Sequence, residues 1–224
     1  MTRNLGRNRV AIVEDHTLFA ESLDVALTLE GHDVHRVALS GNERTASSLL
    51  ATTLRLRARI VLLDLSLGQG VSGLPLVEPL VRSGAAVVVV TGSSDRVLWG
   101  EALRSGASAV LSKAEPLNTI LAAIRHIGEG RAVMDLESRR RLIGDYLSDR
   151  SELHALRAKL DALTPREREV LGHLMLGHTV SEIAAHSVVS EATVRTQVKS
   201  ILAKLHVSSQ IAAVGLAHRA MAHP

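Results

Sequence analysis

The 224-residue sequence predicts a five-stranded, doubly wound parallel α/β domain followed by an all-α domain. Three observations point to this fold class. Short aliphatic runs alternate with amphipathic helical segments as far as Gly128, which is typical of a parallel sheet covered on both faces. After Gly128 only helical segments follow. Hydrophobic residues make up 46% of the chain but aromatic residues only 1%, so the cores must be aliphatic.

Each predicted strand is followed by a predicted helix. The strands are expected at 10–14, 33–39, 59–64, 85–90 and 108–112, and the helices at 17–30, 42–56, 74–82, 94–105 and 116–127. Apolar runs such as Ile60–Leu63 are buried on both faces in parallel sheets, because helices cover each face. Pro79 is expected to interrupt the third helix, since proline lacks the backbone N–H that a helix interior needs.

The second half of the chain carries helix signals only. Residues 136–162 are charged, and four leucines between Leu153 and Leu163 recur at three- and four-residue spacing. This spacing predicts one packed helix face, and it spans too few heptads for a coiled coil. We therefore expect a domain at 9–128, a helical linker at 129–162 and a helical domain at 163–224.

The composition excludes several classes of protein. The chain has no cysteine, which excludes disulfide frameworks and thiolate metal sites. No apolar run approaches the roughly 18 residues of a membrane span, and the basic N-terminus lacks the apolar segment of a signal peptide. We therefore expect a soluble protein of the cytoplasm with no membrane partner. The formal net charge of +3 is weak support for a nucleic-acid partner.

Polar side chains follow the apolar runs at one edge of the predicted sheet. Glu14 and Asp15 end the first strand, Asp64 the third and Thr91 the fourth, and Lys113 follows the fifth. Ligands of open parallel sheets bind at the carboxyl ends of the strands, so these side chains are expected to converge. Carboxylate oxygens suit Mg²⁺, and a divalent cation would relieve the repulsion among the acids. The sequence therefore predicts a magnesium site.

This set of residues resembles the receiver domain of bacterial two-component response regulators. The matching motifs are IVEDHTLF, LLDLS, VVTG and AVLSK, within about Arg9 to Ile127. The resemblance implies that Asp64 accepts a phosphoryl group from a sensor histidine kinase. It also implies that a magnesium ion is held by Glu14, Asp15, Asp64 and the Ser66 backbone carbonyl. By the same resemblance, Thr91 and Lys113 bind the phosphoryl oxygens.

Two positions depart from the usual receiver pattern. Gly68 stands four residues after Asp64, where a proline is common, and Val110 stands three residues before Lys113, where Tyr or Phe is usual. In the family that ring changes position on phosphorylation, whereas Val110 has a short, stiff β-branched side chain. We therefore expect only weak coupling between Asp64 and the rest of the chain.

The C-terminal segment has the signals of successive short helices. Two Thr-x-x-Glu capping boxes begin at positions 164 and 179, and Ser190 precedes a longer helix over Glu191–Leu205. On that helix, aliphatic residues at 194, 198, 201 and 205 form one buried stripe, while Arg195 and Lys199 lie on another face. A short helix, a tight turn and a longer helix with exposed cations predict a helix-turn-helix.

This segment closely resembles the LuxR-type, or NarL/FixJ-type, DNA-binding domain. The matching runs are LTPREREVL, the EIA of SEIAAHS, SEATVRTQVKSILAKL and AAVGLA. Ser187 and Val180 depart from the family, which generally has leucine and asparagine there. The resemblance implies a homodimer that places helix 191–205 in the major groove of a two-fold DNA site. The candidate DNA contacts are Arg195, Thr196, Gln197, Lys199 and Lys204.

We therefore hypothesise that the chain is a DNA-binding response regulator and not an enzyme. One alternative is a phospho-independent transcription factor whose receiver is an interaction or dimerisation module, which Val110 and Gly68 slightly favour. A phosphatase with an aspartate nucleophile would need a second acid where Ser66 stands. In the simplest interpretation, the acids only cap strands and the cations of the longer helix are an ordinary solvated face.

Overall fold

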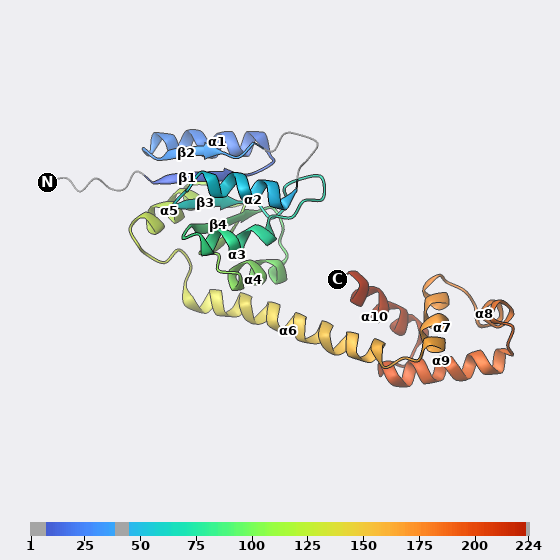
Figure 1. Cartoon of the computed structure of the whole chain (residues 1–224). Helices are drawn as coiled ribbons and strands as arrows, with labels where there is room; N and C mark the ends of the chain where they lie inside the picture. The colour runs from blue at the N-terminus through green and yellow to red at the C-terminus, as the bar shows by residue number, and fades with distance from the viewer. Residues whose placement is uncertain (1–7, 39–44, 223–224) are drawn as a thin grey trace. The chain divides into compact units, whose positions relative to one another are not determined.

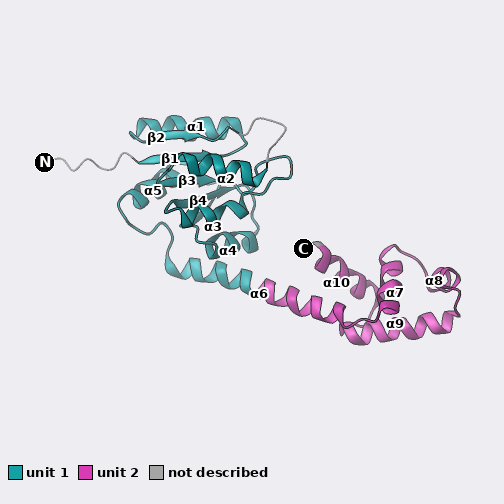
Figure 2. Cartoon of the chain, in the orientation of Figure 1, with its two compact units in different colours: residues 1–147 teal, residues 148–224 magenta. Residues whose placement is uncertain are grey.

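The computed structural model describes residues 8–38 and 45–222, which belong to two compact units, 1–147 and 148–224 (Figure 2). The first unit is a parallel sheet with helices on both faces, and the second is all-helical. The predicted fold class is confirmed. The linker expected at 129–162 is divided between the units, because the helix α6 (Leu136–Asp161) begins in the first unit and ends in the second.

The sheet has the strand order β2-β1-β3-β4-β5, and all neighbouring strands are parallel. Its strands are β1 (Arg9–Val13), β2 (Asp33–Arg36), β3 (Ile60–Leu63), β4 (Ala86–Thr91) and β5 (Ala109–Ser112). The helices between and after them are α1 (Thr17–Leu29), α2 (Ala46–Arg55), α3 (Leu74–Arg82), α4 (Arg96–Arg104) and α5 (Leu117–Gly128) (Figure 1).

Alternate residues of β3 face opposite sides of the sheet. Ile60 and Leu62 pack with α1 and α5, whereas Val61 and Leu63 pack with α2, α3 and α4. Each of these side chains is at most 2% exposed, as expected for a strand covered on both faces. The strand order reverses at β1 and β3, and ligands of doubly wound sheets bind at the carboxyl ends of the strands at such a point.

The structure corrects two details of the predicted helices. Pro79 does not interrupt α3, because in a nine-residue helix its missing N–H removes only one hydrogen bond. The helix α4 begins at Arg96, since the Asp95 carboxylate accepts hydrogen bonds from two backbone N–H groups of the first turn. Residues 39 and 42–44, where the second strand was expected to end and the second helix to begin, lie outside the described residues.

Within the first unit, the start of α6 is clamped onto α4. Gly100 of α4 lies so close to α6 that an added Cβ would meet a backbone carbonyl oxygen at 2.1 Å. At the end of α4, the Arg139 guanidinium donates hydrogen bonds of 2.8 and 2.7 Å to two carbonyl oxygens. At its start, Arg96 pairs with Asp145 at 3.0 Å. The first turns of α6 therefore hold both ends of α4, and the glycine between them permits the contact.

The second unit packs four helices around an aliphatic core. The predicted capping boxes begin α7 and α8, and Ser190 caps α9, which buries the predicted aliphatic stripe. Val188, in the turn before α9, has a φ of 53° and is 89% exposed, an unusual backbone conformation for a β-branched residue. The helices are α7 (Pro165–Met175), α8 (Val180–Ser187), α9 (Glu191–Leu205) and α10 (Gln210–Ala222).

Within the described residues, no single helix is both long and apolar enough to cross a membrane. The helices α9 and α10 have the length and composition of a membrane span only when they are taken together, and they are bent by 57° relative to each other.

Candidate functional site

Three charged side chains meet at the carboxyl edge of the sheet. Val13 of β1 pairs with Leu63 of β3, so Glu14 and Asp64 leave neighbouring strands side by side. The Lys113 ammonium, which follows β5, donates a hydrogen bond of 2.7 Å to each of these carboxylates. The side chains of Glu14 and Asp64 are only 3% and 2% exposed. One lysine thus bridges two buried acids that lie far apart in the sequence.

Burial disfavours the charged forms of the groups in this bridge, and their hydrogen bonds favour them. Burial raises the pKa of the Glu14 carboxyl, and the hydrogen bonds from Lys113 and the His16 backbone N–H offset this rise only in part. Burial alone would lower the pKa of the Lys113 ammonium, but its hydrogen bonds to Asp64 and Glu14 outweigh that effect and raise the pKa. Lys113 therefore remains charged at neutral pH and compensates part of the acidic charge.

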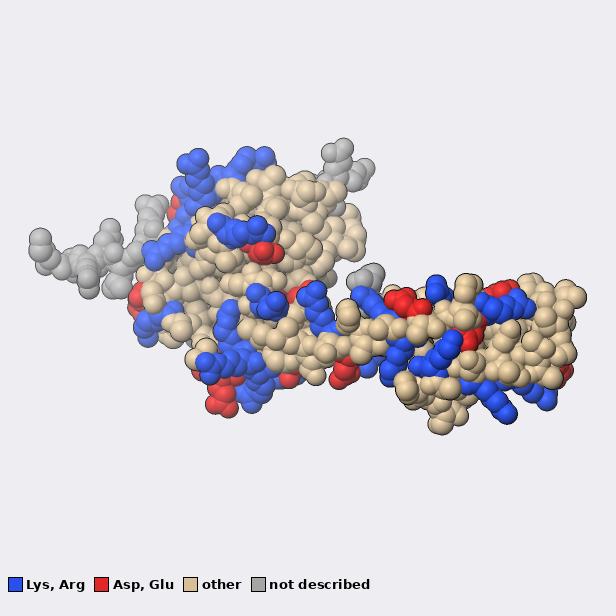
Figure 3. Space-filling view, turned by 60° about the horizontal axis from the view of Figure 1, so that its bottom comes forward, with Lys and Arg blue, Asp and Glu red and all other residues tan. Residues whose placement is uncertain are grey.

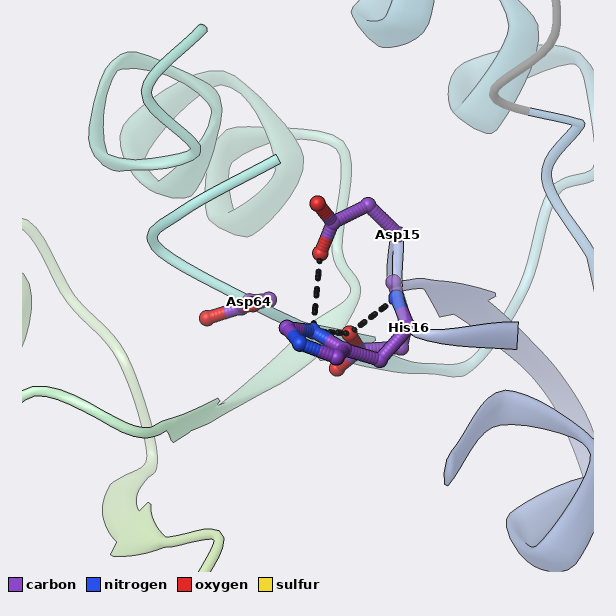
Figure 4. A group of neighbouring side chains, drawn as sticks. Asp15, His16 and Asp64 are labelled. Carbon is purple, nitrogen blue, oxygen red and sulfur yellow. Dashed lines mark hydrogen bonds and ion pairs between the residues drawn. The ribbon is translucent and has the colours of Figure 1, made fainter. Parts of the chain in front are cut away.

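Asp15 gives the edge a third acid. Its Oδ1 atom is buried and has no hydrogen-bond partner among the described residues. One ligand atom each from Glu14, Asp15, His16 and Asp64 lies within 4.8 Å of the others, and Figure 4 shows Asp15 and His16 turned toward each other beside Asp64. An orphaned carboxylate oxygen next to two further acids suits a hard divalent cation such as Mg²⁺. These residues therefore fit the predicted magnesium site.

The loop after Asp64 is fixed by its backbone. The Ser66 N–H donates a hydrogen bond of 3.2 Å to Asp64 Oδ1, which orients the carboxylate. A Cβ on Gly73 would meet the Asp64 carbonyl oxygen at 2.0 Å, so the loop returns against the strand end only with glycine there. Gly68 has a φ of +74°, which a proline cannot adopt. The departure from the usual proline thus follows from a different loop conformation.

Thr91 and Val110 lie on neighbouring strands in different surroundings. Thr91 ends β4, and its hydroxyl accepts a 3.1 Å hydrogen bond from the Ser93 N–H. The Ser93 carbonyl in turn accepts a 2.9 Å bond from the indole of Trp99 in α4. Val110 is 2% exposed and belongs to the core under α3 and α4. Sequence reasoning missed Trp99, for which the only signal was that it is the sole tryptophan.

The predicted DNA-contacting side chains of α9 differ in their availability. Lys199 is exposed and forms no ion pair within the described residues. Arg195 is exposed but pairs with Glu191 at 2.6 Å, and the Thr196 hydroxyl bonds the Ala192 carbonyl at 3.0 Å. The Oε1 atom of Gln197 is buried without a hydrogen-bond partner. On the face that Figure 3 shows, basic and acidic side chains lie interspersed on the helical unit, as Arg195 and Glu191 do on α9.

Lys204 lies in different surroundings from these residues. Its ammonium donates a 2.7 Å hydrogen bond to Glu167, a buried acid that also accepts a bond from the Ser200 hydroxyl and caps α7. The bond from Lys204, followed by that from Ser200, lowers the pKa of Glu167 to about 2. This pair links α7 to α9, so the structure gives Lys204 a structural role, and its predicted contact with a DNA phosphate stays a prediction.

Comparisons with known proteins assign the chain to a family. The model of the response regulator receiver domain matches residues 10–125, and that of the luxR family of bacterial regulatory proteins matches residues 161–217. The nitrate/nitrite response regulator protein NarP of Escherichia coli K12 is 33% identical over 208 residues, which are 92% of each chain. The chain is a two-component response regulator of the NarL/FixJ family. This response regulator is also 31% identical to the transcriptional regulatory protein UhpA of Salmonella typhimurium, over 94% of its own length and 96% of that protein.

Solved structures show the same fold. RcsB of Salmonella enterica serovar Typhimurium, bound to a promoter in the presence of the phosphomimetic BeF₃⁻, matches with a TM-score of 0.51 and 21% identity over 94% of this response regulator and 98% of that chain. A LuxR-family response regulator from Aurantimonas sp. matches with a TM-score of 0.52 and 20% identity over 63% of this chain and 99% of its own. At these identities the likeness concerns the fold alone.

The Glu167 cluster predicts a pH-dependent stability of the DNA-binding unit. Because the pKa of Glu167 is lowered from 4.5 to about 2 in the folded chain, its contribution is complete above pH 4.5 and is lost as the pH falls toward 2. The shift corresponds to at most about 3 kcal/mol, and we expect about 1–2 because Lys204 is partly exposed to solvent. Glu167→Gln should therefore destabilise α7 and α9 clearly more at pH 6 than at pH 2.5.

Amide hydrogen exchange of α7 and α9 in the full chain measures this difference, after correction for the intrinsic effect of pH on exchange. Glu169→Gln is the matched control, since that exposed acid pairs with Arg166 on the same helix and with no other cation in the part of the chain that the structure describes. A destabilisation by Glu167→Gln of the same size at both pH values would contradict the assignment.

Proposed function

We propose that this response regulator accepts a phosphoryl group on Asp64 from a partner histidine kinase with Mg²⁺ bound, and that it binds two-fold DNA sites in the cytoplasm as a homodimer. The observation that carries the proposal is the Lys113 ammonium, 2.7 Å from both Asp64 and Glu14. A preorganised cation beside a buried carboxylate can stabilise the charge that a phosphoryl group brings to it. In this proposal the receiver regulates DNA binding and catalyses no turnover of a separate substrate.

Phosphoryl transfer needs positioning and charge neutralisation more than covalent machinery. An Asp64 carboxylate oxygen attacks phosphorus, while the bond from phosphorus to the donor nitrogen breaks and that nitrogen keeps the electron pair. Glu14, Asp15 and Asp64 would hold a divalent cation, which would supply positive charge to the transferring group. The Ser66 N–H keeps the carboxylate oriented, and the Lys113 ammonium shifts from its two acids to pair with a phosphoryl oxygen.

The remaining residues divide into two groups. Glu14, Asp15, Asp64 and the Ser66 backbone carbonyl hold the cation in this proposal, which is supported by the buried Oδ1 of Asp15 that accepts no hydrogen bond within the described residues. Thr91 binds a phosphoryl oxygen by donating its O–H, which the bond accepted from the Ser93 N–H leaves free. Because the Ser93 carbonyl accepts a bond from the Trp99 indole, a movement of Thr91 toward the phosphoryl group would reach α4.

A phospho-independent transcription factor remains the second candidate. Val110 is buried in the core with no ring or hydroxyl to change partners, and the +74° φ of Gly68 excludes the usual proline. In this alternative the receiver unit serves as an interaction or dimerisation module, and the unmodified protein already binds DNA. Failure of Asp64 to take up a phosphoryl group would favour this candidate.

On the DNA-binding side, we propose that α9 enters the major groove with Lys199 as its principal cation. Lys199 needs to break no ion pair to reach a phosphate or base, whereas Arg195 must first leave Glu191. Thr196 and Gln197 would supply polar contacts. Each requires a change of partner or position, because Thr196 is bonded to its own helix and Gln197 is partly buried.

Phosphorylation should occur only at Asp64 and only with a divalent cation. When the protein is incubated with a small-molecule phosphodonor and Mg²⁺, intact mass should show one phosphoryl adduct, which chelator abolishes. Asp64→Asn should remove the adduct, and Asp24→Asn, a partly buried acid of α1 that lies outside the acidic edge, should keep it. An adduct that persists in Asp64→Asn, or forms equally with excess chelator, would place the phosphoacceptor elsewhere.

Lys199→Ala should reduce the salt dependence of DNA binding by about one unit in the slope of log K against log salt, as expected for one lost phosphate contact. Arg195→Ala should relax base preference at a cost of about 1–3 kcal/mol if its guanidinium reads a base. Titrations of DNA at several salt concentrations measure both effects, with Arg157→Ala on α6 as a charge-matched control. Unchanged slope, affinity and specificity in both variants would move the DNA surface off α9.

A further inference from the structure

His16 stands beside the acidic edge but has no part in the mechanism proposed above. It follows Asp15 directly and precedes the first turn of α1. Its Nδ1 atom lies 3.2 Å from Asp15 Oδ1, 3.4 Å from Glu14 Oε1 and 3.5 Å from the Lys113 ammonium (Figure 4). The ring is 74% exposed, so its position over the acids is not imposed by core packing.

The contact with Lys113 indicates which part of the ring faces the site. Toward the ammonium this nitrogen can only accept a hydrogen bond, and toward the two carboxylate oxygens it can only donate one, so its role depends on which ring nitrogen carries the hydrogen. In the tautomer with the hydrogen on Nε2, Nδ1 offers a lone pair and Asp15 Oδ1 receives no hydrogen from the ring. A nitrogen lone pair and carboxylate oxygens directed at one point form a ligand set for a cation.

The spacing fits a single ion. Ligands on adjacent corners of an octahedron with bonds of about 2.1 Å lie about 3 Å apart. The separations of 3.2 and 3.4 Å from His16 Nδ1 to the two carboxylate oxygens are close to this value. Asp64 supplies a further oxygen within the same 4.8 Å group. At present the Lys113 ammonium lies between Glu14 and Asp64, where it supplies the positive charge.

We propose that His16 is a nitrogen ligand of the divalent cation and biases the site toward a first-row transition-metal ion over Mg²⁺. Mg²⁺ prefers oxygen and keeps several waters, whereas imidazole suits transition-metal dications. The inference rests on the proposed function only in using the same acidic edge. It adds that Mg²⁺ and a transition-metal dication compete for this edge, and that His16 decides which of the two binds more tightly.

Mn²⁺ is the most direct probe, because it shares the octahedral oxygen chemistry of Mg²⁺ and is paramagnetic. Calorimetric titration of the full chain should give a ratio of Mn²⁺ to Mg²⁺ affinity that falls tenfold or more in His16→Ala. Most of the change should be in the Mn²⁺ affinity. Pulsed electron paramagnetic resonance of the Mn²⁺ complex should show coupling to a ¹⁴N nucleus, which His16→Ala removes and the α5 variant His126→Ala retains.

The outcomes separate this inference from the proposed function. Suppose that Asp64 is phosphorylated with Mg²⁺, but the Mn²⁺ complex shows no nitrogen coupling or His16→Ala leaves the ratio of Mn²⁺ to Mg²⁺ affinity unchanged. Either result would overturn the role of His16 and leave the proposed function standing. Binding of neither cation by the wild-type chain would overturn both. Loss of the nitrogen coupling together with the fall in the ratio, in a variant that still binds Mg²⁺, would establish the ligand.

Discussion

The bridging Lys113 ammonium is the interaction on which the acidic edge of the sheet depends. Two carboxylates buried side by side repel each other, and leaving a buried charge unpaired costs several kcal/mol. Parallel pairing of β1 with β3 makes Glu14 and Asp64 neighbours, and Lys113 from β5 reaches both. With Asp15 adjacent, one ammonium compensates only part of the acidic charge. This incomplete compensation leaves negative charge at the edge, which the proposed dication would neutralise before the proposed phosphoryl transfer.

In the second unit a buried glutamate pairs with a partly exposed lysine, and here the hydrogen bonds outweigh the effect of burial. Glu167 accepts bonds from Lys204, Ser200 and the backbone of its own helix start, and its pKa is lowered to about 2. For Glu14 the effect of burial outweighs that of the hydrogen bonds, and its pKa is raised. The pair of Glu167 and Lys204 therefore fixes two helices, whereas the acids around Lys113 are open to exchange of partners. In the first unit, contacts through Ser93, Trp99 and Gly100 join the end of β4 to α4 and α4 to the start of α6.

The sequence was sufficient for features that depend on local pattern. The alternation of aliphatic runs predicted the sheet, the order of the acids along the strands predicted their common edge, and Thr-x-x-Glu spacing predicted two helix starts. Features that depend on distant partners were not predictable. The partner of Lys204 lies 37 residues away and appears only once α7 packs on α9. The need for glycine at position 100 likewise arises from a contact with α6, and His16 meets the ammonium of Lys113, which lies 97 positions later.

We propose that the Lys113 ammonium partly compensates the acidic edge and competes with a divalent cation for it. Thermal unfolding of wild type and Lys113→Met, each with and without saturating Mg²⁺, measures this competition. Lys113→Met should be less stable without cation and should gain more from Mg²⁺ than wild type, by at least about 4 °C, or about 1 kcal/mol for a unit of this size. An equal or smaller gain in Lys113→Met would contradict it.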